Sequence, residues 1–208
     1  MIKFIRSSTA FRTLFVPGAA AGLAAAIALV PQGANAATGT ITFNGSVLGT
    51  TCSVTAATGG NNSSGFSSGN FTVTLPGVQK SALATAGSKA GNTPFSMTLS
   101  GCPTSPSGEQ VAAYFSGSNV NAADGYLTNT TTTGGATNVE IQLLNGSGSS
   151  IDLSQPSAYA QGSSYATINT SGAAKLSYEA QYIVPTGATG GATAGKVTTT
   201  VDYTLVYR

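Results

Sequence analysis

The sequence predicts an all-β fold, and three features of its 208 residues support that expectation. Beyond residue 40, short segments alternate apolar and polar side chains, as strands do when one face of a sheet is buried. Turns rich in Gly and Asn separate these segments, and none of them keeps the period of a helix. Short strands joined by turns are typical of a β-sandwich. Because the chain shows neither a fixed repeat nor a long linker, we expect one domain.

The expected strands follow one another along the chain. They cover residues 41–47, 71–75, 95–99, 111–115, 139–143, 176–182 and 196–207. The segment 111–115 is largely apolar, which favours a strand buried on both faces. Two stretches differ from this pattern. Residues 81–91 have room for a helical turn or two at most, and the Gly-, Ser- and Asn-rich stretch 57–70 predicts a mobile loop.

The first 36 residues have the composition of an export signal. Lys3, Arg6 and Arg12 precede an apolar run over residues 16–30, and a small-x-small motif ends at Ala36. This order predicts a secretory signal peptide with cleavage between Ala36 and Ala37. A membrane anchor is the alternative, but an apolar run of about fifteen residues is shorter than the roughly twenty that a spanning helix needs.

The composition argues against several classes of function. The chain has no His and two Cys, so it offers neither an imidazole base nor enough ligands for a zinc site, and we expect no metal and no cofactor. Three of the eight basic residues lie in the export signal and none of the six acidic residues does, so the exported chain has little net charge. A nucleic-acid partner is therefore not expected.

The acidic residues also give no sign of catalysis. Paired carboxylates could in principle hydrolyse a glycoside. Glu140, Glu179 and Asp202, however, occupy polar positions of alternating strands, where exposure to solvent is the ordinary explanation. Asp124 and Asp152 stand next to Gly- or Ser-containing turns, in which Asp is common. We therefore expect a protein that is not an enzyme.

Cys52 and Cys102 are the only cysteines, and export to an oxidising compartment predicts a disulfide between them. Such a bond closes a loop of about fifty residues, which contributes on the order of 4 kcal/mol in the chain-entropy description. A redox-active pair is less favoured, because the chain has no Cys-x-x-Cys motif and no neighbouring base to activate a thiol.

Several segments together carry a family resemblance. Residues 40–48, with the sequence TITFNGSVL, lie just before the first Cys, and residues 91–102, GNTPFSMTLSGC, end a strand at the second. Gly195 is fourteenth from the C-terminus, Tyr207 is penultimate, and an alternating strand joins them. With these features the exported chain resembles, over essentially its whole length, the pilin subunits of chaperone–usher fimbriae, the type 1 and P pilus family.

The resemblance implies an incomplete immunoglobulin-like β-sandwich that lacks its final strand and exposes a groove along its apolar core. In the family, a periplasmic chaperone lends a strand to this groove, and the N-terminal extension of the next subunit later replaces it. The implied domains are a signal peptide over residues 1–36, a donor-strand extension over 37–49 and a pilin domain over 50–208. The implied partners are other copies of the chain and related pilins, the chaperone and an outer-membrane usher. The implied route leads through the periplasm to a fimbrium at the cell surface.

Within this resemblance, the alternation assigns roles to two sets of residues. A donated strand must fill pockets with every second side chain. The donor set on that face is Gly39, Ile41, Phe43, Gly45 and Val47. The set expected to border the acceptor groove and bind the chaperone is Gly195, Val197, Val201, Tyr203, Leu205, Tyr207 and Arg208, the last through its carboxylate. Two alternatives stay open for residues 39–48: an ordinary first strand of the chain's own sandwich, or a segment folded back into its own groove.

The function that follows is that of a structural subunit used in adhesion. Each copy would donate its N-terminal strand and accept that of a neighbour, a head-to-tail contact that does not close and therefore builds a fibre. The alternative is a minor adaptor or tip-associated fimbrial subunit. A tip adhesin is disfavoured, because adhesins of the family lack the donor segment and carry an additional lectin domain.

Overall fold

The structure is a computed structural model that describes residues 42, 43, 45–59, 67 and 69–208. The predicted signal peptide and cleavage site, together with Gly39 and Ile41 of the predicted donor set, lie outside these residues. The chain divides into two units, Met1–Phe43 and Asn44–Arg208, and every strand of the described residues belongs to the second. The domain boundaries expected after residues 36 and 49 stay predictions.

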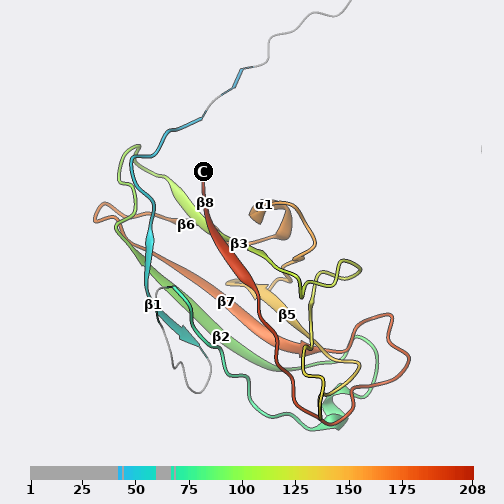
Figure 1. The fold of residues 1–208 in the computed structure, drawn as a ribbon. Helices are drawn as coiled ribbons and strands as arrows, with labels where there is room; N and C mark the ends of the chain where they lie inside the picture. The colour runs from blue at the N-terminus through green and yellow to red at the C-terminus, as the bar shows by residue number, and fades with distance from the viewer. Residues whose placement is uncertain (1–41, 44, 60–66, 68) are drawn as a thin grey trace, which may run out of the picture. The chain divides into compact units, whose positions relative to one another are not determined.

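Two antiparallel β-sheets make up the second unit (Figure 1). The larger sheet has the strand order β1-β2-β7-β5-β4, and the smaller has the order β6-β3-β8. The strands are β1 (Ser53–Gly59), β2 (Lys89–Ser100), β3 (Gln110–Ser116), β4 (Leu127–Thr128), β5 (Glu140–Asn145), β6 (Ala166–Thr167), β7 (Ala174–Ile183) and β8 (Asp202–Tyr207). Helical structure in the described residues consists of a 3-10 turn, η1 (Lys80–Leu83), and one turn of α-helix, α1 (Ala158–Gln161). In this part of the chain, no helix has the length and apolar character needed to cross a membrane.

The hydrophobic core lies between the two sheets, and the alternating pattern decides which side chains enter it. In β7, Leu176, Tyr178 and Ala180 are buried, whereas Ser177 between them is exposed. The backbone N–H of Ala113 in β3 donates a hydrogen bond to the Tyr178 hydroxyl (3.1 Å), so this side chain links the two sheets inside the core. Burial raises the pKa of Tyr178 to about 12, and the hydroxyl stays protonated over the physiological range.

Four of the expected strands are confirmed. Residues 95–99, 111–115 and 176–182 lie within β2, β3 and β7, and β5 begins one residue later than the expected start at residue 139. β3 is buried on both faces over its first apolar residues, as its sequence predicts. The η1 turn agrees with the limited helix expected over residues 81–91, the last three of which already belong to β2.

The loop predicted over residues 57–70 is wrong for its first three residues, because β1 continues through Gly59. The ladder with β2 explains this, since Ala57 pairs with Met97 and Gly59 pairs with Phe95. Gly59 lies so close to Phe95 that a Cβ atom at residue 59 would collide with that side chain. Gly at this position therefore permits close strand packing instead of marking a loop.

Two further expectations are wrong in part. Residues 71–75 form no continuous strand, and of residues 196–207 only the last part forms β8. Residues 196–200 instead bond to a neighbouring loop: the Thr130 N–H donates to the Thr198 carbonyl (2.8 Å), and the Ala136 N–H donates to the Lys196 carbonyl (2.9 Å). Within the described residues, neither segment has a neighbouring strand with which to form a continuous ladder, although both alternate apolar and polar side chains.

Cys52 and Cys102 are joined by the predicted disulfide. They flank the ladder between β1 and β2, in which Ser53 pairs with Ser100, so the bond closes one end of this antiparallel pair. Both cysteines are buried and belong to the main core. The cross-link thereby fastens β1, an edge strand, to the larger sheet.

Candidate functional site: an apolar groove between the sheet edges

On one side of the sandwich, each sheet ends in a strand with a single partner. β1 is the edge of the larger sheet and pairs with β2, and β8 is the edge of the smaller sheet and pairs with β3. Among the described residues, no strand pairs with the outer edge of either. An edge strand of this kind presents N–H and C=O groups with which a further strand can pair.

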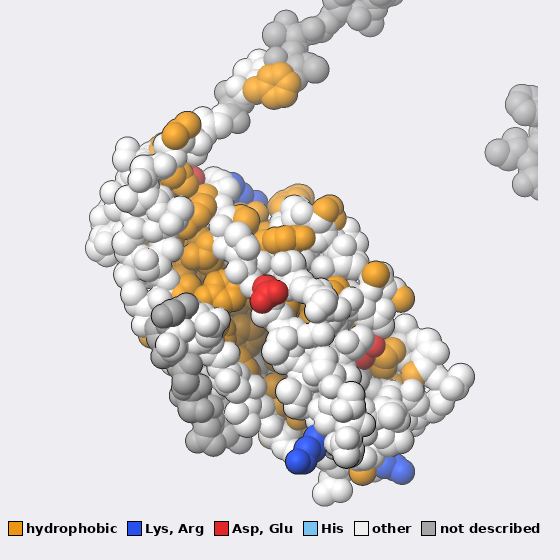
Figure 2. Space-filling model, viewed as in Figure 1, with side chains coloured by type: hydrophobic (Ala, Val, Ile, Leu, Met, Phe, Trp, Pro, Cys, Tyr) orange, Lys and Arg blue, Asp and Glu red, His pale blue; other side chains and the backbone are white. Residues whose placement is uncertain are grey.

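An apolar groove runs between these edges. Figure 2 shows it as a band of hydrophobic side chains in a hollow along one side of the molecule. One rim is formed by residues 71–75, whose Phe71, Val73 and Leu75 pack partly buried against the main core. The other rim is formed by partly buried side chains of the C-terminal segment, namely Val197, Val201, Tyr203, Leu205 and Tyr207. The apolar side chains on both rims remain half-covered, so the core is not closed on this side.

Two tyrosines of β8 reach across the groove. The Tyr203 hydroxyl donates to the Gly69 carbonyl (2.7 Å), and the Cys52 N–H donates to the Tyr207 hydroxyl (2.7 Å). The ring of Tyr203 also lies with its centre 6.3 Å from that of Phe71 on the opposite rim. Burial raises the pKa of Tyr203, which keeps its hydroxyl protonated as a donor. Side chains, and not a backbone ladder, thus connect the two edges.

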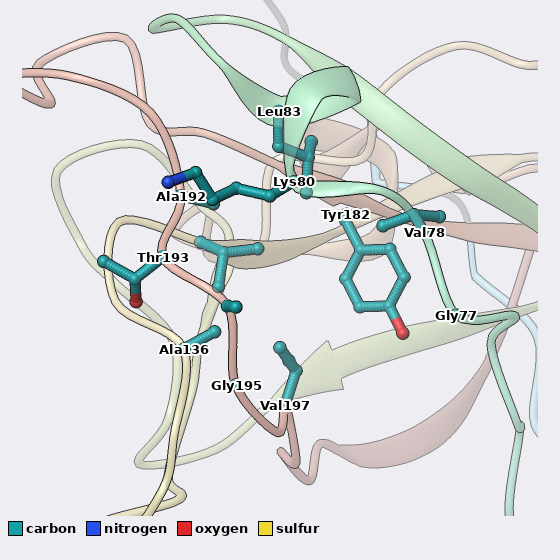
Figure 3. A pocket seen from close by; sticks show the side chains of 12 residues that line it. Gly77, Val78, Lys80, Leu83, Ala136, Tyr182, Ala192, Thr193, Gly195 and Val197 are labelled. Atoms are coloured by element: carbon teal, nitrogen blue, oxygen red, sulfur yellow. The ribbon is translucent and has the colours of Figure 1, made fainter.

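The groove ends in a pocket of about 200 Å³ (Figure 3). The ring of Tyr182 forms part of its wall, with Val78 and Val197 also lining it. Val197 belongs both to the groove rim and to the pocket wall. A Cβ atom at Gly195 would collide with the backbone of Ala136, so Gly is required where these two segments of the wall meet. The pocket is a concave, mainly apolar end to the groove.

The structure brings the predicted groove residues together. Five of them line one rim, and Gly195 and Val197 border the pocket. Arg208 lies at the exposed end of the chain, where its Nε donates to the Gln110 side-chain oxygen (2.9 Å). Its guanidinium carbon stands 3.8 Å from the ring centre of Tyr165. The contact expected between the Arg208 carboxylate and a chaperone stays a prediction.

Three residues of the predicted donor set are described, and all are exposed. Phe43 is 89% exposed and Val47 is 97% exposed, while Gly45 between them has no atom within 4 Å of a Cβ placed on it. Large apolar side chains that the chain's own core leaves uncovered are candidates for contact with another protein. The segment therefore offers apolar side chains, and the groove offers an apolar surface.

Sequence reasoning did not assign the opposite rim, and it assigned only Gly195 and Val197 of the pocket wall. Phe71, Val73 and Leu75 were expected as part of a strand, with no role in the site, and Tyr182 had no role either. The alternation of residues 71–75 was a usable signal for an inward face. Their position opposite β8 follows from the sheet order, which a single sequence does not reveal.

The expectation that Glu140 is a solvated surface residue is wrong, because only 8% of it is exposed. The loop before β4 covers this side chain, and Asn121 Nδ2 donates to Glu140 Oε1 (3.0 Å). The turn expectations for Asp124 and Asp152 agree with the structure, since each accepts a hydrogen bond from the backbone N–H two residues ahead (3.2 and 3.0 Å). None of these carboxylates lines the groove described above.

Comparison with known proteins relates this chain to one family. The family model described as type-1 fimbrial protein A matches residues 75–208, a range that includes β8 and the pocket. The chain belongs to this family. Among relatives of this fimbrial protein, the major fimbrial subunit SMF-1 of Stenotrophomonas maltophilia is 41% identical over 184 residues, covering 87% of the chain and 99% of the relative. A fimbrial protein of Escherichia coli is 44% identical over 174 residues, covering 82% of the chain and 87% of the relative.

A solved structure supports the fold of this fimbrial protein. The P pilus rod subunit PapA superimposes with a TM-score of 0.52 at 16% identity, covering 73% of the chain and 99% of that subunit. The predicted fold class, an all-β, incomplete immunoglobulin-like sandwich, is confirmed. The chain is a structural fimbrial subunit, a component of surface pili that assembles with other pilins.

Proposed function

We propose that this pilin polymerises head to tail by donor-strand exchange, with residues 37–49 of one copy filling the groove of the next. The observation that carries the proposal is that the groove is open while Phe43 and Val47 of the same chain are uncovered. Addition of a strand to an open edge provides main-chain hydrogen bonds and seats alternate side chains in pockets, as it does in chaperone–pilin complexes. Each copy then supplies what its neighbour lacks.

The energetics favour a long-lived joint. Burial of Ile41, Phe43 and Val47 contributes about 1.5–3 kcal/mol for each side chain. Each ladder hydrogen bond adds about 0.5–1.5 kcal/mol. In this proposal Gly45 lies at a position where the groove has no room for a side chain. The half-buried rim residues of the acceptor also become covered, so the contact completes a core as well as forming an interface.

The direction of the donated strand follows from where the N-terminal segment joins the domain. Cys52 lies at the C-terminal end of β8, because its N–H contacts the Tyr207 hydroxyl. The segment before Cys52 could therefore enter its own groove only parallel to β8. A neighbour's segment is free to enter antiparallel, the slightly more stable pairing. Antiparallel insertion brings Val47 to the pocket beside Gly195.

Two further partners are needed before assembly, while the groove is still empty. A groove with an exposed apolar floor promotes aggregation unless it is covered. We propose that a periplasmic chaperone covers it during export, gripping the Arg208 carboxylate, and that an outer-membrane usher mediates the exchange at the surface. The high identity to a major fimbrial subunit favours a place in the pilus shaft over that of a minor adaptor.

A truncated pilin tests this proposal. The exported chain shortened to begin at Ser46 lacks most of the donor set, and a peptide spanning residues 37–48 supplies it separately. We expect the peptide to raise the melting temperature by at least about 10 °C, because a ligand that binds only the folded state stabilises it. Differential scanning calorimetry measures this shift.

The matched control is the same peptide with Phe43→Ser, which keeps the length and the backbone but loses the largest apolar side chain. It should produce a much smaller shift than the unmodified peptide. A truncated chain that is already stable and monomeric, and that responds to neither peptide, would show that the domain completes its own core. Donor-strand exchange would then be wrong for this chain.

A further inference from the structure

A buried carboxyl group lies away from the groove, at the start of β5. Glu140 is only 8% exposed, although its place in an alternating strand marks it as polar. Its Oε1 accepts a hydrogen bond from Asn121 Nδ2 (3.0 Å), while Oε2 is buried without a hydrogen-bond partner among the described residues. An ionised carboxylate with a buried, unpaired oxygen is strongly unfavourable. Some ligand of this oxygen is therefore to be expected.

A second carboxyl group shares the same donor. Asn121 Nδ2 also donates to Asp124 Oδ2 (3.3 Å), so a single amide nitrogen contacts both acids. The loop is turned back on itself at this point, since the Gly125 N–H donates to the Asn121 carbonyl (2.8 Å). Two carboxyl groups held this close do not both ionise without mutual repulsion. One positive charge or one proton between them removes the conflict.

The groups around Glu140 are acidic or neutral. Its ladder partners are Thr128 in β4 and Ile183 in β7, neither of which ionises. The acidic groups of the loops packed nearby are Asp124, Tyr126 and Asp152. Burial raises the pKa of Tyr126, and the carboxylates of Asp124, Asp152 and Glu140 raise it further. Burial raises the pKa of Glu140, and Asp124 adds to this effect, while the Asn121 hydrogen bond opposes it. No group of three acidic, His or Cys side chains suited to a metal ion is found in the described residues, so a proton fits better than a cation.

We propose that Glu140 carries a proton on Oε2 and donates it in a hydrogen bond to the neighbouring Asp124 carboxylate, and that this bond clamps the loop of residues 121–126 onto β5. The clamp lies close to the rim of the groove in sequence and in space, because Asn119 Nδ2 donates to the Thr200 carbonyl (3.0 Å) just before β8 begins. The proposal does not depend on donor-strand exchange. It makes the pilin domain more stable in mildly acidic surroundings than at neutral pH.

The sign of the pH effect follows from the raised pKa. Well below the ordinary value of 4.5, Glu140 is protonated in both the folded and the unfolded chain, and it has no differential effect. As the pH rises through 4.5, the unfolded chain ionises first and gains stability relative to the folded chain. The contribution of Glu140 to the melting temperature therefore falls until the pH exceeds the pKa of Glu140 in the folded chain, and it is constant above that pH.

Glu140→Gln tests the proposal in the full exported chain. The amide is isosteric with the protonated acid, so the variant should lack the decline that begins near pH 4.5 and melt about 2–4 °C above wild type at pH 7.5. Asp124→Asn removes the second carboxyl and should shrink the decline. Glu179→Gln is the matched control, because it makes the same change at a less buried carboxylate in β7, on the same face of the larger sheet, and it should leave the difference unchanged.

A second measurement keeps the test independent of any variant. The carboxyl carbon of Glu140, followed by NMR in the wild-type chain, should titrate above the range of a glutamate in the denatured chain. Titration in the ordinary range, or a Glu140→Gln variant that melts below wild type at pH 7.5, would overturn the proposal. Calcium chloride that raises the wild-type melting temperature at pH 7.5 as much as Glu140→Gln does would also overturn it, since the pair would then bind a cation.

Discussion

β7 and β8 have similar sequence patterns and different surroundings. Both alternate large apolar with polar residues over most of their length. β7 lies between β2 and β5, and its Leu176 and Tyr178 are 2% and 1% exposed. β8 pairs with β3 alone in the described residues, and its inward side chains are only partly buried. The same local pattern therefore occurs in a strand with neighbours on both edges and in a strand with a neighbour on one edge only.

The difference shows what alternation does and does not specify. It specifies which face of a strand points to the core, because successive side chains point to opposite faces. It does not specify whether the strand has neighbours on both edges, since the neighbours come from distant parts of the chain or from another chain. In this pilin, the edge that stays open is the one at which we propose a second copy supplies the partner.

The largest expected effect is the loss of assembly when the donor segment is changed. Phe43→Asp removes about 1.5–3 kcal/mol of apolar burial and adds a charge to the groove, so assembly should fall by roughly 100-fold or more. Tyr159→Asp is the matched control, because Tyr159 is also a large exposed side chain (75% exposed) but lies on α1 of the domain. Electron microscopy and the yield of sedimenting fibres measure the outcome.

The two variants must differ for the donor assignment to hold. The circular-dichroism spectrum of each monomer should stay that of the parent chain, since both side chains are exposed. Normal fibres from Phe43→Asp would show that the donor set is wrong. An equal loss from both variants would show instead that any added charge prevents assembly.

A second pair of variants compares the same truncation in the two strands. Leu176→Ala in β7 leaves a cavity in a closed core and should cost about 2–5 kcal/mol, as Leu→Ala changes in well-packed cores do. Leu205→Ala in β8 removes a partly buried side chain and should cost less in the truncated chain. When the peptide of residues 37–48 is added, the cost at Leu205 should rise while that at Leu176 stays the same. Urea unfolding with and without peptide measures both differences, and an unchanged cost at Leu205 would show that the peptide does not cover β8.

Much of the fold could be predicted from the sequence, for a physical reason that particular strands illustrate. Residues 95–99 and 176–182 alternate regularly, and their strands have neighbours on both edges for most of this length, so their local pattern and their final structure agree. The disulfide between Cys52 and Cys102 could be predicted from export and the count of two. β1 could not, because its apolar side chains are small and its identity as a strand depends on the ladder with β2.

The candidate site could be predicted on one rim only. Val201, Tyr203 and Leu205 stand in a long alternating segment near the C-terminus, which the sequence displays directly. The opposite rim and the pocket around Tyr182 require the sheet order, which is a property of the whole chain. Burial of Glu140 could not be predicted either. The strand pattern shows that Glu140 is polar, but it does not show that the loop containing Asn121 folds over this side chain.

The smallest expected effect is on the free energy of unfolding when a single tyrosine hydroxyl is removed from β7 or from β8. Tyr178→Phe in β7 leaves the N–H of Ala113 buried without a partner and should cost about 1–3 kcal/mol. Tyr203→Phe in β8 releases the carbonyl of Gly69, which is partly exposed and can bind water, so the cost should be nearer 0.5–1 kcal/mol, the lower end of the usual range of about 0.5–1.5 kcal/mol. Addition of the peptide should exclude that water and raise the cost at Tyr203, with no change at Tyr178. Urea unfolding of the truncated chain measures the four values. Equal costs at Tyr203 with and without the peptide would mean that the groove between β8 and residues 69–75 is not where the strand is received.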